Sequence, residues 1–160
     1  MKNINLIMVL MLFALSTFGQ PNVPQESVNS DPSVLIKEFF DAYRAHNREK
    51  VSSMMHPDIL WTQPGNNRLS GVKKSREEVK AMGKLMAELS AKTIELADIK
   101  VLNATGNSVA CLLRWKAVQP TGNVLDVENI DIYTIENGLI VNAKIYSADL
   151  IQEDKFWGKN

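Results

Sequence analysis

Two polar residues, Asn129 and Asp131, lie within the β-branched and aromatic run Leu125–Ile135. Such a run is typical of a strand with one buried face, where a carboxyl group loses its hydration and its pKa rises. A carboxyl group with a raised pKa can act as a general acid, a general base or a hydrogen-bond donor. Asp131 is therefore the candidate catalytic residue. The alternative is a partly solvated strand carboxylate paired with a lysine or arginine.

Three β-rich runs, Val109–Val118, Leu125–Ile135 and Leu139–Tyr146, are separated by turns that contain glycine. This pattern predicts an antiparallel meander. The register of its first hairpin decides where Asp131 points, because a slip of one residue moves Asp131 to the face opposite Trp115. We expect Asp131 to line a pocket on the packed face of the sheet.

Upstream of the meander, the sequence predicts two strands and three helices. Between Lys92 and Leu102 the alternation of apolar residues changes phase. A β-bulge at Ala97–Asp98 would place the apolar residues before and after it on the same side of the strand, and it would also bend the sheet. A bent sheet packed on a helix can enclose a cavity. The short run Ile59–Thr62 is a further expected strand.

The first helix is expected to begin at Asp31 as its N-cap and to end near His46. Asn47 then caps a short second helix, and a capping box at Ser75–Glu78 opens a third. The apolar stripe predicted for the first helix comprises Val34, Leu35, Phe39, Ala42 and Tyr43. The order of helices and strands predicts an α+β fold with helices on one face of a curved sheet.

The amino end reads as an export signal. Lys2 precedes the apolar run Leu6–Leu15, and small residues around Gly19 offer a cleavage site. We expect a signal peptide over residues 1–19, a flexible leader over 20–30, one domain over 31–160, and a secreted or periplasmic protein. An uncleaved membrane anchor is the alternative.

The composition narrows the class of partner. The chain has 18 Lys and Arg against 18 Asp and Glu, so no net charge draws it to nucleic acid or, after signal cleavage, to a membrane. Cys111 is the only cysteine and is expected to be a small buried residue. His46 and His56 lack further ligands at metal spacing, so no metal is expected. The sequence has no phosphate-binding glycine loop and no dinucleotide fingerprint, so no other cofactor is expected.

Several short stretches, taken in order, resemble the nuclear transport factor 2-like superfamily and, within it, the SnoaL-like group. They are Phe40–Asn47, His56–Gly65, Leu69–Gly71, Trp115, Asn129–Tyr133 and Asn137–Val141. The resemblance implies a cone-shaped fold, in which a curved mixed sheet wraps around the N-terminal helices and a pocket opens at one end. It also implies a homodimer that forms through the outer side of the sheet.

Ketosteroid isomerase-like enzymes share this cone, and the resemblance limits the chemistry expected here. Their catalytic tyrosine falls near Phe39, which has no hydroxyl, and their proton-shuttling carboxylate falls near Gln63. Only their hydrogen-bond-donating acid has a counterpart, Asp131. Steroid isomerisation of that kind is therefore not expected.

We expect the domain to bind a small, largely apolar molecule in the cone. The residues expected to line its pocket, besides Asp131, are Phe39, Tyr43, Trp61, Met86, Trp115 and Asn129. One alternative is an isomerase, cyclase or dehydratase in which Asp131 moves a proton with help from Tyr43 or Asn129. Another is a homodimeric protein-interaction module that uses the sheet and the Phe156–Trp157 tail. The sequence leaves open whether the chain is an enzyme, and it names no ligand.

Overall fold

The computed structural model describes residues 31–159. The expected signal peptide and leader therefore lie outside the described residues. Ten elements follow one another along the chain: α1 (Pro32–Arg44), α2 (Arg48–Ser53), β1 (Met55–Gln63), β2 (Gly71–Lys73), α3 (Arg76–Leu89), β3 (Glu95–Thr105), β4 (Ser108–Val118), β5 (Val124–Glu136), β6 (Leu139–Ser147) and α4 (Leu150–Trp157). None of the helices in this part of the chain is long and apolar enough to cross a membrane.

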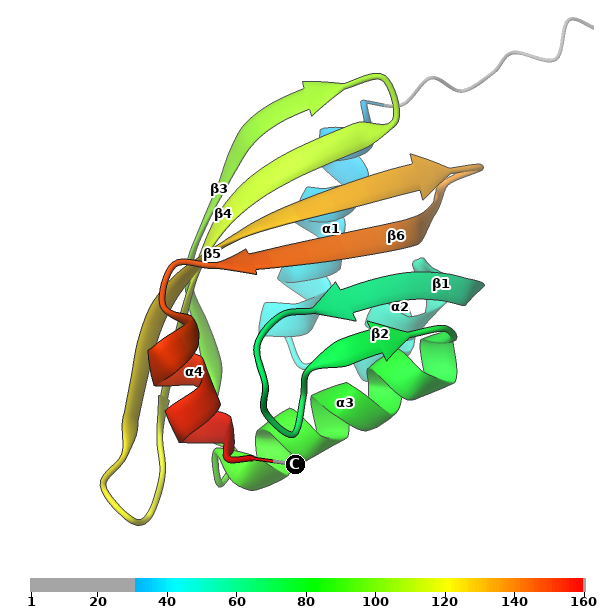
Figure 1. Cartoon of the computed structure of the whole chain (residues 1–160). Helices are drawn as coiled ribbons and strands as arrows, with labels where there is room; N and C mark the ends of the chain where they lie inside the picture. The colour runs from blue at the N-terminus through cyan, green and yellow to red at the C-terminus, as the bar shows by residue number, and fades with distance from the viewer. Residues whose placement is uncertain (1–30, 160) are drawn as a thin grey trace, which may run out of the picture.

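The six strands form one mixed sheet in the order β2-β1-β6-β5-β4-β3. β1 and β6 run parallel, and every other neighbouring pair is antiparallel. The sheet is strongly curved, with α1 and α3 packed against its inner side (Figure 1). This is the expected α+β cone.

The curvature of the sheet has a local cause at the predicted bulge. The pairing of β3 with β4 shifts between Leu96 and Asp98, which places an extra residue at Ala97. A second shift follows between Val101 and Asn103. Because a bulge bends its strand and increases its twist, β3 and β4 curve away from the plane of the other strands.

α1 is the helix around which the sheet wraps. The Asp31 carboxylate accepts a hydrogen bond from the Ser33 amide at 2.9 Å, which fixes the start of the helix as expected. The predicted stripe was wrong at Val34, which is 48% exposed, whereas Ile36 is fully buried. Residues two apart on a helix point about 200° apart. The buried stripe therefore follows Ile36, Phe39 and Phe40.

The start of α3 differs from a complete capping box. The Ser75 hydroxyl accepts from the Glu78 amide at 3.2 Å, as expected. The Glu78 carboxylate, however, accepts from the amide of Lys74 at 2.7 Å, one residue before the cap. Both interactions satisfy backbone donors that have no partner within the helix.

Two elements, β2 and α4, were not predicted. β2 pairs with the end of β1 over Trp61–Gln63. α4 begins at Asp149, whose carboxylate accepts from the Gln152 amide at 2.9 Å. Its aromatic residues Phe156 and Trp157 are buried in the chain's own core.

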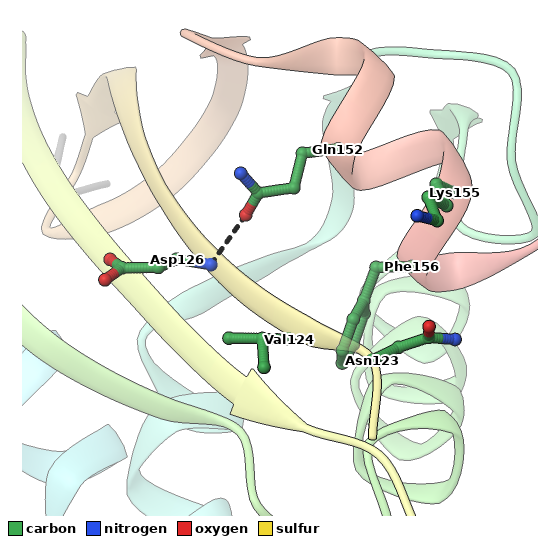
Figure 2. Close-up of a pocket in the computed structure, with 6 residues that line it drawn as sticks. All are labelled: Asn123, Val124, Asp126, Gln152, Lys155 and Phe156. Atoms are coloured by element: carbon green, nitrogen blue, oxygen red, sulfur yellow. Dashed lines mark hydrogen bonds between the residues drawn. The ribbon is translucent and has the colours of Figure 1, made fainter. Parts of the chain in front are cut away.

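α4 lies along the part of β5 that extends beyond the pairing with β6. The Gln152 side chain reaches from α4 to the backbone of β5, where its oxygen accepts from the Asp126 amide at 2.6 Å (Figure 2). The Ala148 amide donates to the carbonyl of Glu128 at 2.9 Å. An uncovered strand edge offers free backbone groups to other chains. α4 and its connection occupy such groups here.

Candidate functional site

A cavity of about 880 Å³ lies between the helices and the inner face of the sheet. Its wall receives side chains from α1, α3, β1, β4, β5 and α4. All seven residues expected at a site line it: Phe39, Tyr43, Trp61, Met86, Trp115, Asn129 and Asp131. The structure thus brings together residues separated by up to 92 positions in the sequence.

Aromatic side chains form much of this wall. Tyr43 of α1 and Trp115 of β4 meet edge to face, with ring centroids 5.3 Å apart. Trp61 of β1 lies 6.0 Å from the ring of Tyr133 and donates a hydrogen bond to the Gln63 oxygen at 3.3 Å. Burial raises the pKa of Tyr43 to about 12, so its hydroxyl remains a donor at neutral pH.

The strand register places Asp131 on the inner face. Asp131 pairs with Cys111 and Val127 pairs with Trp115, so the side chains of Asp131 and Trp115 share one side of the sheet. Asp131 is only 3% exposed. Tyr133 follows two residues later on the same face, and its hydroxyl donates to Asp131 Oδ2 at 2.7 Å.

Burial raises the pKa of Asp131 to about 7. The hydrogen bond from Tyr133 opposes this shift, and the negative charge of Glu153 adds to it. Burial also holds the pKa of Tyr133 well above its usual range, so Tyr133 donates and does not ionise near neutral pH. The carboxyl group of Asp131 can therefore exist in either protonation state near neutrality, as a proton-transfer group requires.

A second carboxyl group reaches the same wall from α4. Glu153 is 2% exposed and lines the cavity. Burial raises its pKa, while hydrogen bonding by Ser147 and Asn129 partly opposes the rise. Asn129, Asp131 and Glu153 thus form a polar cluster within a mainly apolar wall, which we call the acceptor cluster.

Paired charges lie on the other side of the sheet from the cavity. Arg114 donates two hydrogen bonds to the Asp126 carboxylate, at 2.7 and 2.9 Å, and Lys116 lies 3.7 Å from the same group. In the part of the chain that the structure describes, no ion pair includes Asp131. The alternative of a strand carboxylate paired with lysine or arginine therefore fits Asp126 and does not fit Asp131.

Over residues 31–159, no group of three or more His, Cys, Asp and Glu side chains is arranged to hold a metal ion. Cys111 is buried as expected. Burial, reinforced by the charge of Asp131, raises the pKa of its thiol to about 12, so it is not a nucleophile at neutral pH.

A smaller groove of about 290 Å³ lies where α4 meets β5 (Figure 2). The side chains of Asn123, Val124 and Lys155 are exposed there. Its main polar groups are already satisfied, because Gln152 bonds the Asp126 amide and Asp126 bonds Arg114. We therefore take the larger cavity as the candidate site.

A family model described as a SnoaL-like domain matches residues 36–143, more than half of the chain. The chain belongs to the SnoaL-like domain family. Its place in the nuclear transport factor 2-like superfamily follows from this match and from the folds of similar solved structures. A search of curated proteins gives no match.

Solved structures share the cone of this SnoaL-like domain. A Xanthomonas campestris protein of unknown function with a cystatin-like fold is 31% identical, with a TM-score of 0.77 over 81% of this chain and 100% of its own. TerC, co-crystallised with polyporic acid, is 18% identical, with a TM-score of 0.69 over 79% and 98%. A putative polyketide cyclase from Pseudomonas putida is 16% identical, with a TM-score of 0.64 over 81% and 99%.

The sequence analysis missed two residues near Asp131 in the SnoaL-like domain, Tyr133 and Glu153. Tyr133 was counted among the apolar residues of β5, although its spacing of two from Asp131 places both on one face. Glu153 was not singled out because it lies in a short charged tail. Its spacing of three and four residues from Phe156 and Trp157 is the signal that could have placed it on a buried helical stripe.

Proposed function

We propose that this SnoaL-like protein binds a small, largely apolar molecule in the large cavity. The observation that carries the proposal is the cavity itself, about 880 Å³ in volume and lined mainly by aromatic and aliphatic side chains, with polar and charged side chains among them. Cavities of several hundred Å³ with this composition are typical of small-molecule sites. The co-crystal of TerC with polyporic acid gives further support.

Filling the cavity is expected to weaken binding. Met86 lines the cavity from α3, whereas Glu88 on the same helix is exposed and does not. In isothermal titration calorimetry, the methyl ether of naphthol should bind the wild-type protein, and Met86→Trp should weaken binding about tenfold or more, a change of about 1.4 kcal/mol. Glu88→Trp is the matched control and should bind as the wild type does. Absence of binding to the wild type, or equal binding by Met86→Trp, would contradict the proposal.

A second function, proton transfer at a bound carbonyl compound, is favoured by the state of Asp131. Its carboxyl group has a pKa of about 7 and lies in the cavity wall, hydrogen-bonded to Tyr133. An isomerase, cyclase or dehydratase would use this group as acid and base, with Tyr43 or Asn129 assisting. If the protein is such an enzyme, Asp131→Asn should lose turnover of a molecule that it still binds. Retained turnover in that variant would exclude this role.

Export and dimer formation are further parts of the proposal. Export is supported by the apolar run near the amino end. A homodimer is supported by the outer face of the sheet, where Leu112, Ile130 and Tyr146 stand in register across β4, β5 and β6. Ile130 and Tyr146 expose large apolar surfaces there, as interfaces between subunits do.

Native mass spectrometry of protein isolated from its own host tests both parts. We expect a chain that begins at Gln20 and a complex with twice the mass of that chain. A chain that still begins at Met1 would contradict export, and a monomer at micromolar concentration would contradict the dimer. A retained small molecule in the same spectrum would support the binding function.

A further inference from the structure

Three buried oxygen atoms of the acceptor cluster have no hydrogen-bond donor. They are Asn129 Oδ1, Asp131 Oδ1 and Glu153 Oε1, and no side chain or backbone donor of residues 31–159 bonds them. Their residues are 5%, 3% and 2% exposed and all line the large cavity. Buried polar atoms nearly always have a partner, so each such exception requires an explanation.

The protein's own donors do not satisfy these three atoms, although Ser147 and the Asn129 amide act on the Glu153 carboxyl group. The Tyr133 hydroxyl is already bonded to the other oxygen of Asp131. A single proton held between the two carboxyl groups would satisfy at most two of the three oxygens. No lysine or arginine in the described part of the chain forms an ion pair with Asp131 or Glu153. The cluster therefore offers acceptors in excess of donors.

The rest of the cavity wall differs in chemistry from the acceptor cluster. Tyr43, Trp61 and Trp115 present aromatic surface, and Met55, Met82 and Met86 present flexible apolar surface. A molecule that fills the cavity therefore meets these acceptors and a largely apolar wall, to which His46, Arg48, Glu77, Lys80, Lys84 and Lys92 add ionisable side chains. Leaving such acceptors unpaired in an apolar site is unfavourable, and a matching donor on the ligand would remove that cost.

We propose that the ligand of this cavity has an apolar body and a hydrogen-bond-donating group, a hydroxyl or an amino group, that binds the acceptor cluster of Asn129, Asp131 and Glu153. This inference rests on the proposed binding function and adds the polarity of the ligand. The same argument makes Glu153 of α4 a specificity-determining residue. A ligand that offers only acceptors to this cluster would leave the three oxygens unpaired.

Three naphthalene compounds test the inference by calorimetry at about pH 8, where the Asp131 carboxyl group is mainly ionised. They are naphthol, its methyl ether, in which the donor is blocked, and naphthylmethylamine, which offers a charged donor. We expect naphthol or the amine to bind the wild-type protein about tenfold or more tightly than the ether, as one hydrogen bond to a charged group predicts. Preference for the alcohol or for the amine identifies the type of donor.

Substitutions in the acceptor cluster test whether it causes the preference for donor compounds. Glu153→Leu and Asn129→Leu should each bring the affinity for the preferred donor compound to within about threefold of that for the ether, while changing the affinity for the ether less than about twofold. Asp126→Asn, on the outer face of the sheet, is the matched control and should keep the wild-type preference. Thermal melts of each variant check that it is folded, and either leucine variant alone suffices for the test.

The outcomes separate this inference from the binding function. If the ether binds as tightly as both donor compounds, or if the preference survives in folded Glu153→Leu and Asn129→Leu, the inference is overturned and the binding function stands. If none of the three compounds binds the wild-type protein, both the inference and the proposed binding function are contradicted. A donor preference that disappears only in the cluster variants supports both.

Discussion

The Asp131→Asn variant is expected to be more stable than the wild-type protein by about 4 kcal/mol at about pH 8, and equally stable below about pH 4. Burial raises the pKa of the Asp131 carboxyl group from its ordinary value of 3.8 to about 7. Above that pH the folded wild-type protein holds a buried negative charge without a cationic partner. An asparagine of the same shape carries no charge, and its oxygen can still accept from Tyr133.

The direction of the pH dependence follows from the two pKa values. Because the folded value is about 7 and the unfolded value about 3.9, the folded protein holds this proton more tightly between those limits. The stability contributed by the protonated group is complete below about pH 4 and is lost as the pH rises through about 7. At about 1.4 kcal/mol for each pH unit between the two values, the loss is about 4 kcal/mol.

Urea unfolding of both proteins between about pH 4 and pH 8 measures this difference. Asp126→Asn is the control, because Asp126 is exposed and its hydrogen bond to Arg114 lowers its pKa. Removing that carboxylate should give no gain in stability at high pH. Curves for wild type and Asp131→Asn that stay parallel over this range would show that Asp131 ionises as freely in the folded protein as in the unfolded one.

Much of the fold could be predicted because its signals are local. The change of phase around Ala97 predicted the bulge, and Asp31, Asn47 and Ser75 marked the starts of three helices. β2 has only three residues and no pattern of its own, since it is defined by its pairing with β1. α4 was missed because its buried stripe contains Glu153, and a charged residue in a short segment normally indicates an exposed face.

The residues of the candidate site also differ in whether a local sequence signal marks them. Asp131 could be singled out because a carboxyl group is unusual within a strand of mostly apolar residues. Glu153 reaches the same wall from a helix that begins 19 positions after Asp131, and no sequence spacing reports that approach. Its place depends on α4 closing over the end of β5, which is a tertiary contact.

The second large expected effect is a loss of stability when the packing of α4 against the sheet is weakened. Trp157→Ala is expected to lower the free energy of unfolding by about 3 to 5 kcal/mol, as loss of a buried tryptophan usually does. Trp157 is buried, packs edge to face on Phe156 with centroids 4.7 Å apart, and lines the cavity. Its removal enlarges the cavity and weakens the contact that holds α4 against the sheet. Urea unfolding measures the change.

Ile151→Ala on the same helix is the control, because Ile151 is 83% exposed and an exposed substitution usually changes stability by less than about 0.5 kcal/mol. If α4 packs as the structure shows, only Trp157→Ala should also reduce the preference of the cavity for donor compounds, since Glu153 is carried by the same helix. Equal, small effects of the two substitutions would mean that α4 is not held against the core in solution. In that case Glu153 would be hydrated, and only Asn129 and Asp131 of the acceptor cluster would remain in the cavity wall.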